Sequence, residues 1–190
     1  PLGIEFWIGT PEEVEPRVAP MMMHAPKPGD PIGEFMMKIM TDPRSTQALS
    51  LLNTGGFDPN SRACHAAEIG GGGGISNARG LAGMYAPLAC GGELGGVRLV
   101  DRAQLARMGE VSVATNEDAT LLIPTRFSLG FMKSMDNRRT PRGDRDSAIL
   151  SSAAFGHVGA GGSIGFADPE LGMSFGYSMN RMGPGIMLNE

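Results

Sequence analysis

Residues 155–179 read FGHVGAGGSIGFADPELGMSFGYSM, and this stretch decides the fold class. Bulky apolar residues alternate with other residues over 164–166 and again over 171–179. A period of two is typical of a β-strand with one buried face. The residues between the two runs, Asp168-Pro-Glu170, favour a tight turn. We therefore predict an antiparallel hairpin, with the glycine-rich segment 156–161 leading into its first strand.

The second strand of this hairpin has two unlike faces. Its odd-numbered positions from 171 to 179 are bulky and apolar, whereas its even-numbered positions from 172 to 178 are Gly or Ser. Such a small-residue face would fit a closely packed helix. We expect that helix to come from outside the given sequence, and solvent exposure of the face is the alternative.

Two further segments lie between the hairpin and the N-terminal half. The alternation of Phe127, Leu129 and Phe131 predicts another strand. Residues 133–146 are polar, contain a proline and show no periodicity, so we expect an exposed loop there.

Helices are predicted upstream, from capping residues and apolar spacing. They are a helix over 30–40 with Asp30 as N-cap and Pro31 at N1, one from Asp42 to Gly55, a helical turn within 61–69, one from Ser76 to Cys90, and one at 101–108 capped by Asp101. Helices followed by antiparallel strands indicate an α+β fold.

Composition excludes several classes of function. The chain has 16 Lys and Arg against 20 Asp and Glu, so we predict no nucleic-acid partner. No apolar run is long enough for a membrane span. Cys64 and Cys90 lie far apart and form no C-x-x-C pair, so we expect buried thiols. The three histidines show no metal-ligand spacing, and we predict no metal.

His157 is the best candidate for chemistry. It lies among glycines, whose bare backbone lets a substrate approach closely, and histidine exchanges protons near neutral pH. The alternative is a strand histidine satisfied by local hydrogen bonds. His65 is interpreted as a local hydrogen-bonding residue on a loop or turn.

Two glycine patterns suggest chemistry that their context does not support. Ser163 stands in a G-x-S-x-G pattern, but a nucleophile elbow needs a helix after the serine and an alternating strand follows instead. We do not expect Ser163 to be a nucleophile. The glycines at 70–74 and 159–165 lack the Lys-Ser/Thr of a phosphate loop, so we predict no cofactor.

Residues 155–170, followed by 172–182, resemble the C-terminal sheet of class C β-lactamase-like serine hydrolases, which include the family VIII carboxylesterases. Three more segments resemble the middle of the esterase-like members: PLGIEFWIG at 1–9, HAAEI at 65–69 and SNARGLA at 76–82. The resemblance implies a β-lactamase/transpeptidase-like fold, an antiparallel sheet flanked by helices. It also implies that residues 1–190 are the C-terminal part of one such domain, mostly helix and loop over 1–125 and sheet strands over 126–182.

The resemblance assigns roles to three residues. In that family a serine of S-x-x-K attacks the acyl carbonyl, its lysine and a tyrosine of Y-x-N handle protons, and a K-T-G or H-x-G motif lines the pocket. His157-Val158-Gly159 matches this third motif. The resemblance implies that His157 positions the substrate or helps in proton transfer, that Gly159 leaves room for the acyl group, and that the amide of Ala160 is an oxyanion donor.

The nucleophile motif of the family is absent from the sequence. No S-x-x-K occurs, and neither Tyr85 nor Tyr177 begins a Y-x-N. Ser76-Asn-Ala-Arg79 comes nearest, but arginine stays protonated and cannot act as a base. We expect the serine and lysine on an N-terminal segment missing here, as a partner of this chain, and the final helix of the family fold to be absent too.

We therefore expect part of a serine hydrolase that cleaves small acyl esters, with β-lactams or amides as further substrates, and that is inactive as this chain alone. The alternative is a catalytically inactive β-lactamase-like module for binding or assembly. We expect a cytoplasmic protein, with any targeting signal upstream of Pro1.

Overall fold

The protein is described by a computed structural model that covers residues 2–30, 32–139 and 147–188. At its centre is a six-stranded antiparallel sheet in which each strand pairs with the next one along the chain, in the order β10-β9-β8-β7-β6-β5. The strands are β5 (Val113–Thr115), β6 (Thr125–Phe127), β7 (Met132–Lys133), β8 (Phe155–Val158), β9 (Ile164–Asp168) and β10 (Met173–Tyr177). The sheet thus begins at Val113, earlier than residue 126.

The predicted C-terminal hairpin is confirmed as β9 and β10. Asp168 pairs with Met173 and Ile164 with Tyr177. The turn is held by the buried carboxylate of Asp168, whose Oδ1 accepts hydrogen bonds from the amides of Glu170 and Leu171 at 3.1 and 3.3 Å. The period-two pattern and the Asp-Pro turn therefore specify this part of the sheet locally.

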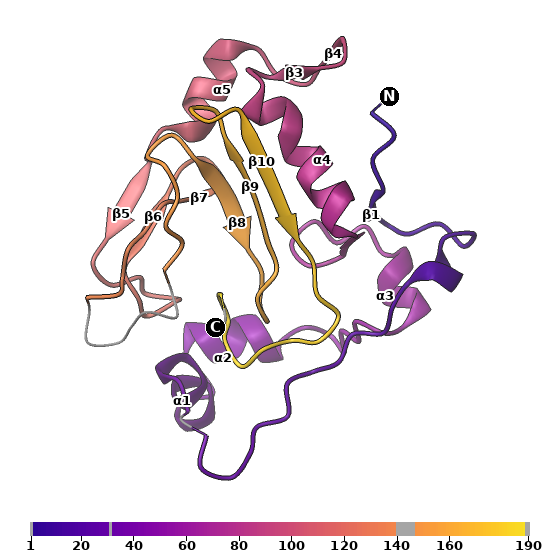
Figure 1. Ribbon diagram of the computed structural model, residues 1–190. Coiled ribbons are helices and arrows are strands. Elements are labelled where there is room, and N and C mark those ends of the chain that lie inside the picture. Colours follow the sequence, from indigo (N-terminus) through magenta and orange to yellow (C-terminus); the bar gives the residue numbers. More distant parts are fainter. Residues whose placement is uncertain (1, 31, 140–146, 189–190) are drawn as a thin grey trace.

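The helices lie beside the sheet and at both of its ends (Figure 1). They are α1 (Glu34–Thr41), α2 (Thr46–Leu52), α3 (Arg62–Ala66), α4 (Ala78–Ala89) and α5 (Arg102–Gly109), with a 3₁₀-helix at Glu15–Arg17. Two small antiparallel pairs complete the described fold: β1 (Phe6–Ile8) with β2 (Gly74–Ser76), and β3 (Glu93–Leu94) with β4 (Val97–Arg98). Helices α1 and α2 contact each other.

Three of the predicted helix starts are wrong by one to three residues. Helix α1 is capped by Gly33, because Asp30 instead accepts a hydrogen bond from the amide of Lys27 at 2.7 Å, and Pro31 lies outside the described residues. Helix α2 is capped by Ser45 rather than Asp42, and α4 by Asn77 rather than Ser76. The predicted cap Asp101 is confirmed, since it accepts from the amide of Gln104 at 2.7 Å.

The single strand predicted over 127–131 is wrong. Ser128 and Gly130 belong to a turn between β6 and β7, in which the amide of Ser128 donates to the carbonyl of Phe131 at 2.8 Å. Gly130 has a φ of +83°, which favours glycine. The turn-forming residues override the alternation of phenylalanines here.

The exposed loop predicted over 133–146 is only partly correct where the segment is described, because Asp136, Arg138 and Arg139 are exposed but other residues are not. Lys133 in β7 is only 3% exposed, and Met135 and Asn137 are buried as well. The Nζ of Lys133 donates to the carbonyl of Ala153 at 3.3 Å and lies 5.9 Å from the centre of the Phe155 ring. These partners lie more than fifteen residues away, so the local pattern does not reveal them. Residues 140–146 lie outside the described part.

The helix on the small face of β10 is α4, so the expectation that it comes from outside this chain is wrong. A Cβ on Gly176 would lie 2.6 Å from the carbonyl oxygen of Ala78 and 2.5 Å from the amide of Ala82. Gly165 of β9 is equally tight against Tyr85, at 2.5 Å. The small residues are therefore required by the close approach of helix and sheet.

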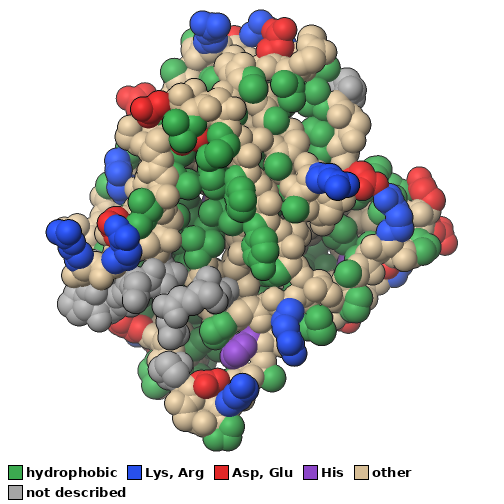
Figure 2. Space-filling model, viewed as in Figure 1, with side chains coloured by type: hydrophobic (Ala, Val, Ile, Leu, Met, Phe, Trp, Pro, Cys, Tyr) green, Lys and Arg blue, Asp and Glu red, His purple; other side chains and the backbone are tan. Residues whose placement is uncertain are grey.

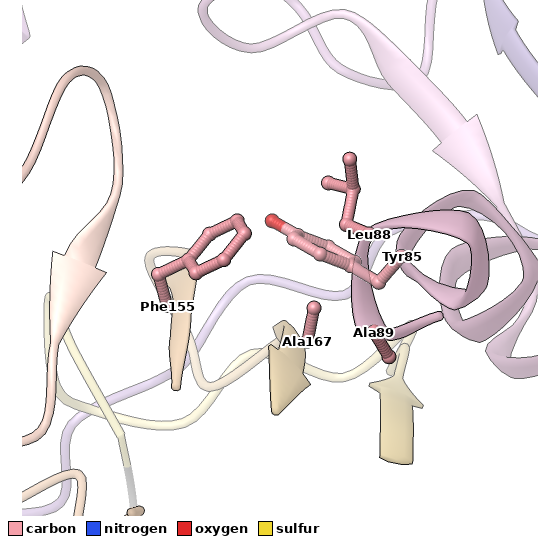
Figure 3. Packing of buried hydrophobic residues seen from close by; sticks show 5 residues of the cluster. All are labelled: Tyr85, Leu88, Ala89, Phe155 and Ala167. Carbon is pink, nitrogen blue, oxygen red and sulfur yellow. The ribbon is translucent and has the colours of Figure 1, made fainter. Parts of the chain in front are cut away.

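The core between α4 and the sheet consists of Tyr85, Leu88, Ala89, Phe155 and Ala167, with Phe131 against it (Figure 3). A second cluster contains Val158, Ile123, Met132 and Met187. Phe155 and Val158 lie on opposite faces of β8 because side chains alternate along a strand. The sheet is therefore packed on both faces, and His157 lies on the same face of β8 as Phe155.

Candidate active site

His157 is exposed and lies on the third residue of β8, opposite Gly165 of β9. Gly165 has no side chain to cover the imidazole from the neighbouring strand. The ring of Phe127 lies beside it, with the ring centres 6.2 Å apart and the planes inclined at 43°. The histidine is thus supported on one side and open on another.

One ring nitrogen of His157 is used internally. Its Nδ1 lies 2.6 Å from the carbonyl oxygen of Val158. A carbonyl oxygen only accepts, so Nδ1 carries the hydrogen and a neutral ring has its lone pair on Nε2. Nε2 has no hydrogen-bond partner within the described ranges. It can therefore accept a proton and, once protonated, donate a hydrogen bond.

A tight turn over residues 159–163 follows this histidine. The amide of Gly159 donates to the carbonyl of Ser163 at 2.8 Å, and the amide of Gly162 donates to the carbonyl of Gly159 at 3.0 Å. A Cβ on Gly159 would lie 2.3 Å from the Oγ of Ser163. A side chain at residue 159 would therefore displace the hydroxyl of Ser163.

Ala160 lies at the exposed tip of this turn. Its amide donates to no acceptor among the residues that the structure describes. An exposed amide without an internal acceptor is what an oxyanion hole needs. It is two residues from the strand that carries His157, so the two groups lie at the same end of β8.

Ser163 lacks the geometry of a nucleophile elbow. It leads directly into β9, with no helix after it, and its Oγ packs against Gly159. Tyr85 is also unsuited to proton transfer, because burial raises the pKa of its phenol to about 12. Figure 3 shows it pointing into the core beside Phe155.

The C-terminal segment holds the turn from the other side, which sequence reasoning missed. The amide of Gly161 donates to the carbonyl of Gly185, and the amide of Gly183 donates to the carbonyl of Gly161, both at 2.9 Å. Gly161 has a φ of +83°, and a Cβ there would lie 2.7 Å from the Cβ of Met182. The glycines at 183 and 185 hint at a close backbone approach, but no neighbouring residue indicates that their partner is Gly161.

His65 has both ring nitrogens engaged. Nδ1 lies 2.8 Å from Oε1 of Glu15, and Nε2 lies 2.7 Å from the carbonyl oxygen of Pro59. The side chain is buried on α3. His65 is therefore a hydrogen-bonding residue, as interpreted, but it lies on a helix rather than a loop, and its partner Glu15 is fifty residues away rather than local.

The two cysteines are free thiols. The expectation of burial is wrong for Cys90, which is exposed because it follows the last residue of α4, and Cys64 is only half-buried. In the described part of the chain, no three His, Cys, Asp or Glu side chains gather as a metal site. None of the helices there has the length and apolar character needed to cross a bilayer.

Comparisons with known proteins agree on one family. The beta-lactamase family model matches residues 1–188. The esterase/beta-lactamase LipL of Mycobacterium tuberculosis is 36% identical over 116 residues, which are 61% of this chain and 24% of that protein.

Solved structures resemble almost the whole chain. A family VIII carboxylesterase has a TM-score of 0.70 at 30% identity, over 97% of this chain and 43% of its own. EstA from Arthrobacter nitroguajacolicus Rue61a has a TM-score of 0.72 at 31% identity, over 97% and 46%. A penicillin-binding protein homolog from Caulobacter crescentus has a TM-score of 0.71 at 28% identity, over 98% and 45%.

The chain spans less than half the length of each of these proteins. The fold is shared over nearly all of its residues, and both the antiparallel sheet and the flanking helices match the predicted β-lactamase/transpeptidase-like architecture. The family model covers all but the last two residues. This chain therefore belongs to the beta-lactamase family.

Proposed function

We propose that this chain is the C-terminal part of a serine hydrolase that cleaves carboxylic esters through an acyl-enzyme. The observation that carries the proposal is the arrangement at the end of β8, where neither Nε2 of His157 nor the amide of Ala160 has a partner among the described residues. One group can exchange a proton, and the other can stabilise an oxyanion. Family membership and the esterase names of two relatives support the same chemistry.

The nucleophile comes from polypeptide outside these 190 residues. A serine Oγ attacks the ester carbonyl carbon, its proton passes to a neighbouring base, and the negative charge develops on the carbonyl oxygen. The amide of Ala160 donates to that oxygen. The alcohol leaves with a proton, and water then releases the acid from the acyl-serine. His157 lies beside the acyl group and either orients it or takes part in the proton transfer.

Ester hydrolysis is favoured over β-lactam or amide hydrolysis by the third motif. His157 stands where K-T-G has a lysine, whose permanent positive charge would attract the carboxylate that β-lactams carry. A wall without that lysine suits an uncharged ester. β-Lactams and amides remain substrates to be assayed beside the ester.

The test uses a hydrolase chimera, in which residues 1–190 replace the matching part of the family VIII carboxylesterase that resembles this chain. We expect the chimera to hydrolyse a nitrophenyl ester and the 190-residue chain alone to be inactive. Turnover by the isolated chain that a fluorophosphonate abolishes would show that the nucleophile lies within it. A folded chimera without turnover would favour the second candidate, an inactive binding or assembly module. The absence of S-x-x-K from the sequence is the observation that supports that candidate.

A further inference from the structure

A hollow of about 320 Å³ lies where α4 ends, between the β3–β4 hairpin and the start of α5. Its wall includes Cys90 after α4, Glu93 and Arg98 from the hairpin, and Arg102 from α5. Figure 1 places these elements at the top of the molecule, at the end of the sheet opposite to the turn over 159–163, and Figure 2 shows basic and acidic side chains gathered there. The volume is at the lower end of the range for small-molecule sites.

Backbone geometry fixes the frame around this hollow. The hairpin turn consists of Gly95 and Gly96, whose φ angles of +57° and +77° suit a two-residue turn that favours glycine. The carbonyl of Gly92 accepts hydrogen bonds from the amides of Leu99 and Val100 at 2.9 and 3.3 Å. A Cβ on Gly92 would lie 2.2 Å from the carbonyl oxygen of Val100. The hairpin is therefore held directly against the residues that precede α5.

The charged groups of this wall do not balance. Arg98 forms an ion pair with Glu93, and the neighbouring acid Asp101 is used to cap α5. Arg102 has no hydrogen bond or ion pair with any residue that the structure describes. The wall therefore carries two positive charges against one negative charge, and the donors of one guanidinium are unused.

We propose that this hollow binds a small organic anion through a carboxylate or phosphate group, with Arg102 as the main contact and Arg98 as the second. A guanidinium is always charged and offers a planar fork of N–H donors that fits both groups. The volume is far larger than the share of one water molecule, about 30 Å³, so an organic ion fits it better than a lone inorganic one. Gly91 and Gly95 in the same wall leave room for it, because a Cβ on either would meet nothing within 4 Å. The proposal does not depend on ester hydrolysis.

The exposed thiol of Cys90 lies on the wall of the hollow and serves as a reporter of the site. The 190-residue chain carrying Cys64→Ser is treated with dithiobis(nitrobenzoate), a disulfide with two carboxylates, or with the uncharged dithiodipyridine. In both reactions the Cys90 thiolate attacks one sulfur of the reagent, the S–S bond of the reagent breaks, and the other half leaves as a coloured thiolate or thione. The ratio of the two rates therefore measures how strongly the hollow attracts the carboxylates.

One substitution tests the main contact. We expect Arg102→Gln to slow the reaction with the carboxylate reagent about fivefold and to leave the rate of the uncharged reagent within about twofold. Arg107→Gln is the matched control, because it removes the same charge from an exposed residue at the other end of α5 that does not line the hollow. It should change neither rate. Arg102 is exposed, so the Tm of Arg102→Gln should stay within about 2 °C of the parent.

Competition identifies the group that binds. Citrate and inorganic phosphate are added separately, each against sodium chloride at the same ionic strength, because salt alone screens surface charges. We expect at least one of them to slow the carboxylate reagent with a saturating dependence on concentration, and to lose this effect in Arg102→Gln. Protection by citrate alone assigns a carboxylate, and protection by phosphate alone assigns a phosphate.

Three results would overturn the proposal. They are an equal slowing of both reagents by Arg102→Gln, an equal slowing of the carboxylate reagent by Arg107→Gln, and protection by citrate and phosphate no greater than that by sodium chloride. Each would leave only the general charge of the surface. No ester is present in these measurements, so their failure leaves the proposed hydrolase untouched, and an inactive chimera leaves the anion site untouched.

Discussion

Gly176 of β10 and Ala82 of α4 lie so close that a Cβ on the glycine would stand 2.5 Å from the amide nitrogen of the alanine. The contact joins residues far apart in sequence and fixes the distance between the helix and the sheet. We expect Gly176→Ala to lower the free energy of unfolding by about 2 kcal/mol, because neither backbone can give way easily. Denaturant unfolding measures the change. Gly71→Ala is the control, since a Cβ there meets nothing within 4 Å, and an equal loss in both variants would contradict the close approach.

The pair of the buried His65 and the half-buried Glu15 links α3 to the 3₁₀-helix across fifty residues. Removal of the imidazole leaves the carboxylate of Glu15 and the carbonyl of Pro59 without this partner. We expect His65→Ala to lower the free energy of unfolding by about 2 kcal/mol. A double-mutant cycle with Glu15→Gln should give a coupling free energy of about 1 kcal/mol. Additive effects of the two substitutions would show that the pair does not interact.

Asp118 makes the stability of the loop between β5 and β6 dependent on pH. Burial alone would raise the pKa of its carboxyl, but hydrogen bonds from the amides of Leu121 and Thr120 and from the hydroxyl of Thr125 outweigh burial and hold the pKa below 3.8. A lowered pKa in the folded state stabilises the protein above the unfolded value, and this contribution is lost as the pH falls below about 3.8 through the folded pKa.

Thermal melts between pH 6 and pH 2 test this linkage. We expect the wild-type protein to lose more of its Tm over the acid range than Asp118→Asn, which cannot titrate and still offers an amide oxygen to the same donors. Parallel Tm curves for the two proteins would show that Asp118 contributes nothing to the acid sensitivity.

His157 should matter for activity and little for stability, because its side chain is exposed. In the hydrolase chimera we expect His157→Ala to lower kcat/KM for a nitrophenyl ester by about 10²-fold. His157→Lys restores the alternative residue of the third motif and should recover part of the activity. Tm measurements on both variants are the control, and a loss of Tm that parallels the loss of activity would indicate a structural role.

The amide of Ala160 can be removed by substitution with proline. If it donates to the oxyanion, Ala160→Pro should lower kcat of the chimera by about 10²-fold, while Ala160→Ser keeps the amide and most of the activity. Circular dichroism and Tm check that the proline variant keeps its fold. Full activity in a folded Ala160→Pro chimera would exclude this amide as the donor.

Elements of the fold that depend on neighbouring residues could be predicted from the sequence. The β9–β10 hairpin follows from alternation and an Asp-Pro turn, and α5 follows from the cap at Asp101. The starts of three helices were predicted wrongly, because several residues that can cap a helix stand close together and only one of them does so. The alternation of Phe127, Leu129 and Phe131 led to a wrong strand prediction, because a turn that contains Ser128 and Gly130 interrupts it.

The candidate site shows the same division. The H-x-G motif brought His157, Gly159 and Ala160 together on one short segment, and the structure places His157 and the amide of Ala160 at one end of β8. The anchoring of Gly161 by Gly183 and Gly185 could not be predicted, because a backbone hydrogen bond across more than twenty residues leaves no periodic trace.

The hairpin, the third motif of the family and the absence of S-x-x-K can be recognised in the sequence alone, since each depends on residues that are neighbours in the chain. The packing of α4 on the small face of β10, the burial of Lys133 and the open opposite face of β10 become visible only in the folded chain. Packing partners are chosen by shape and burial among segments far apart in sequence, and that choice is made when the whole chain folds.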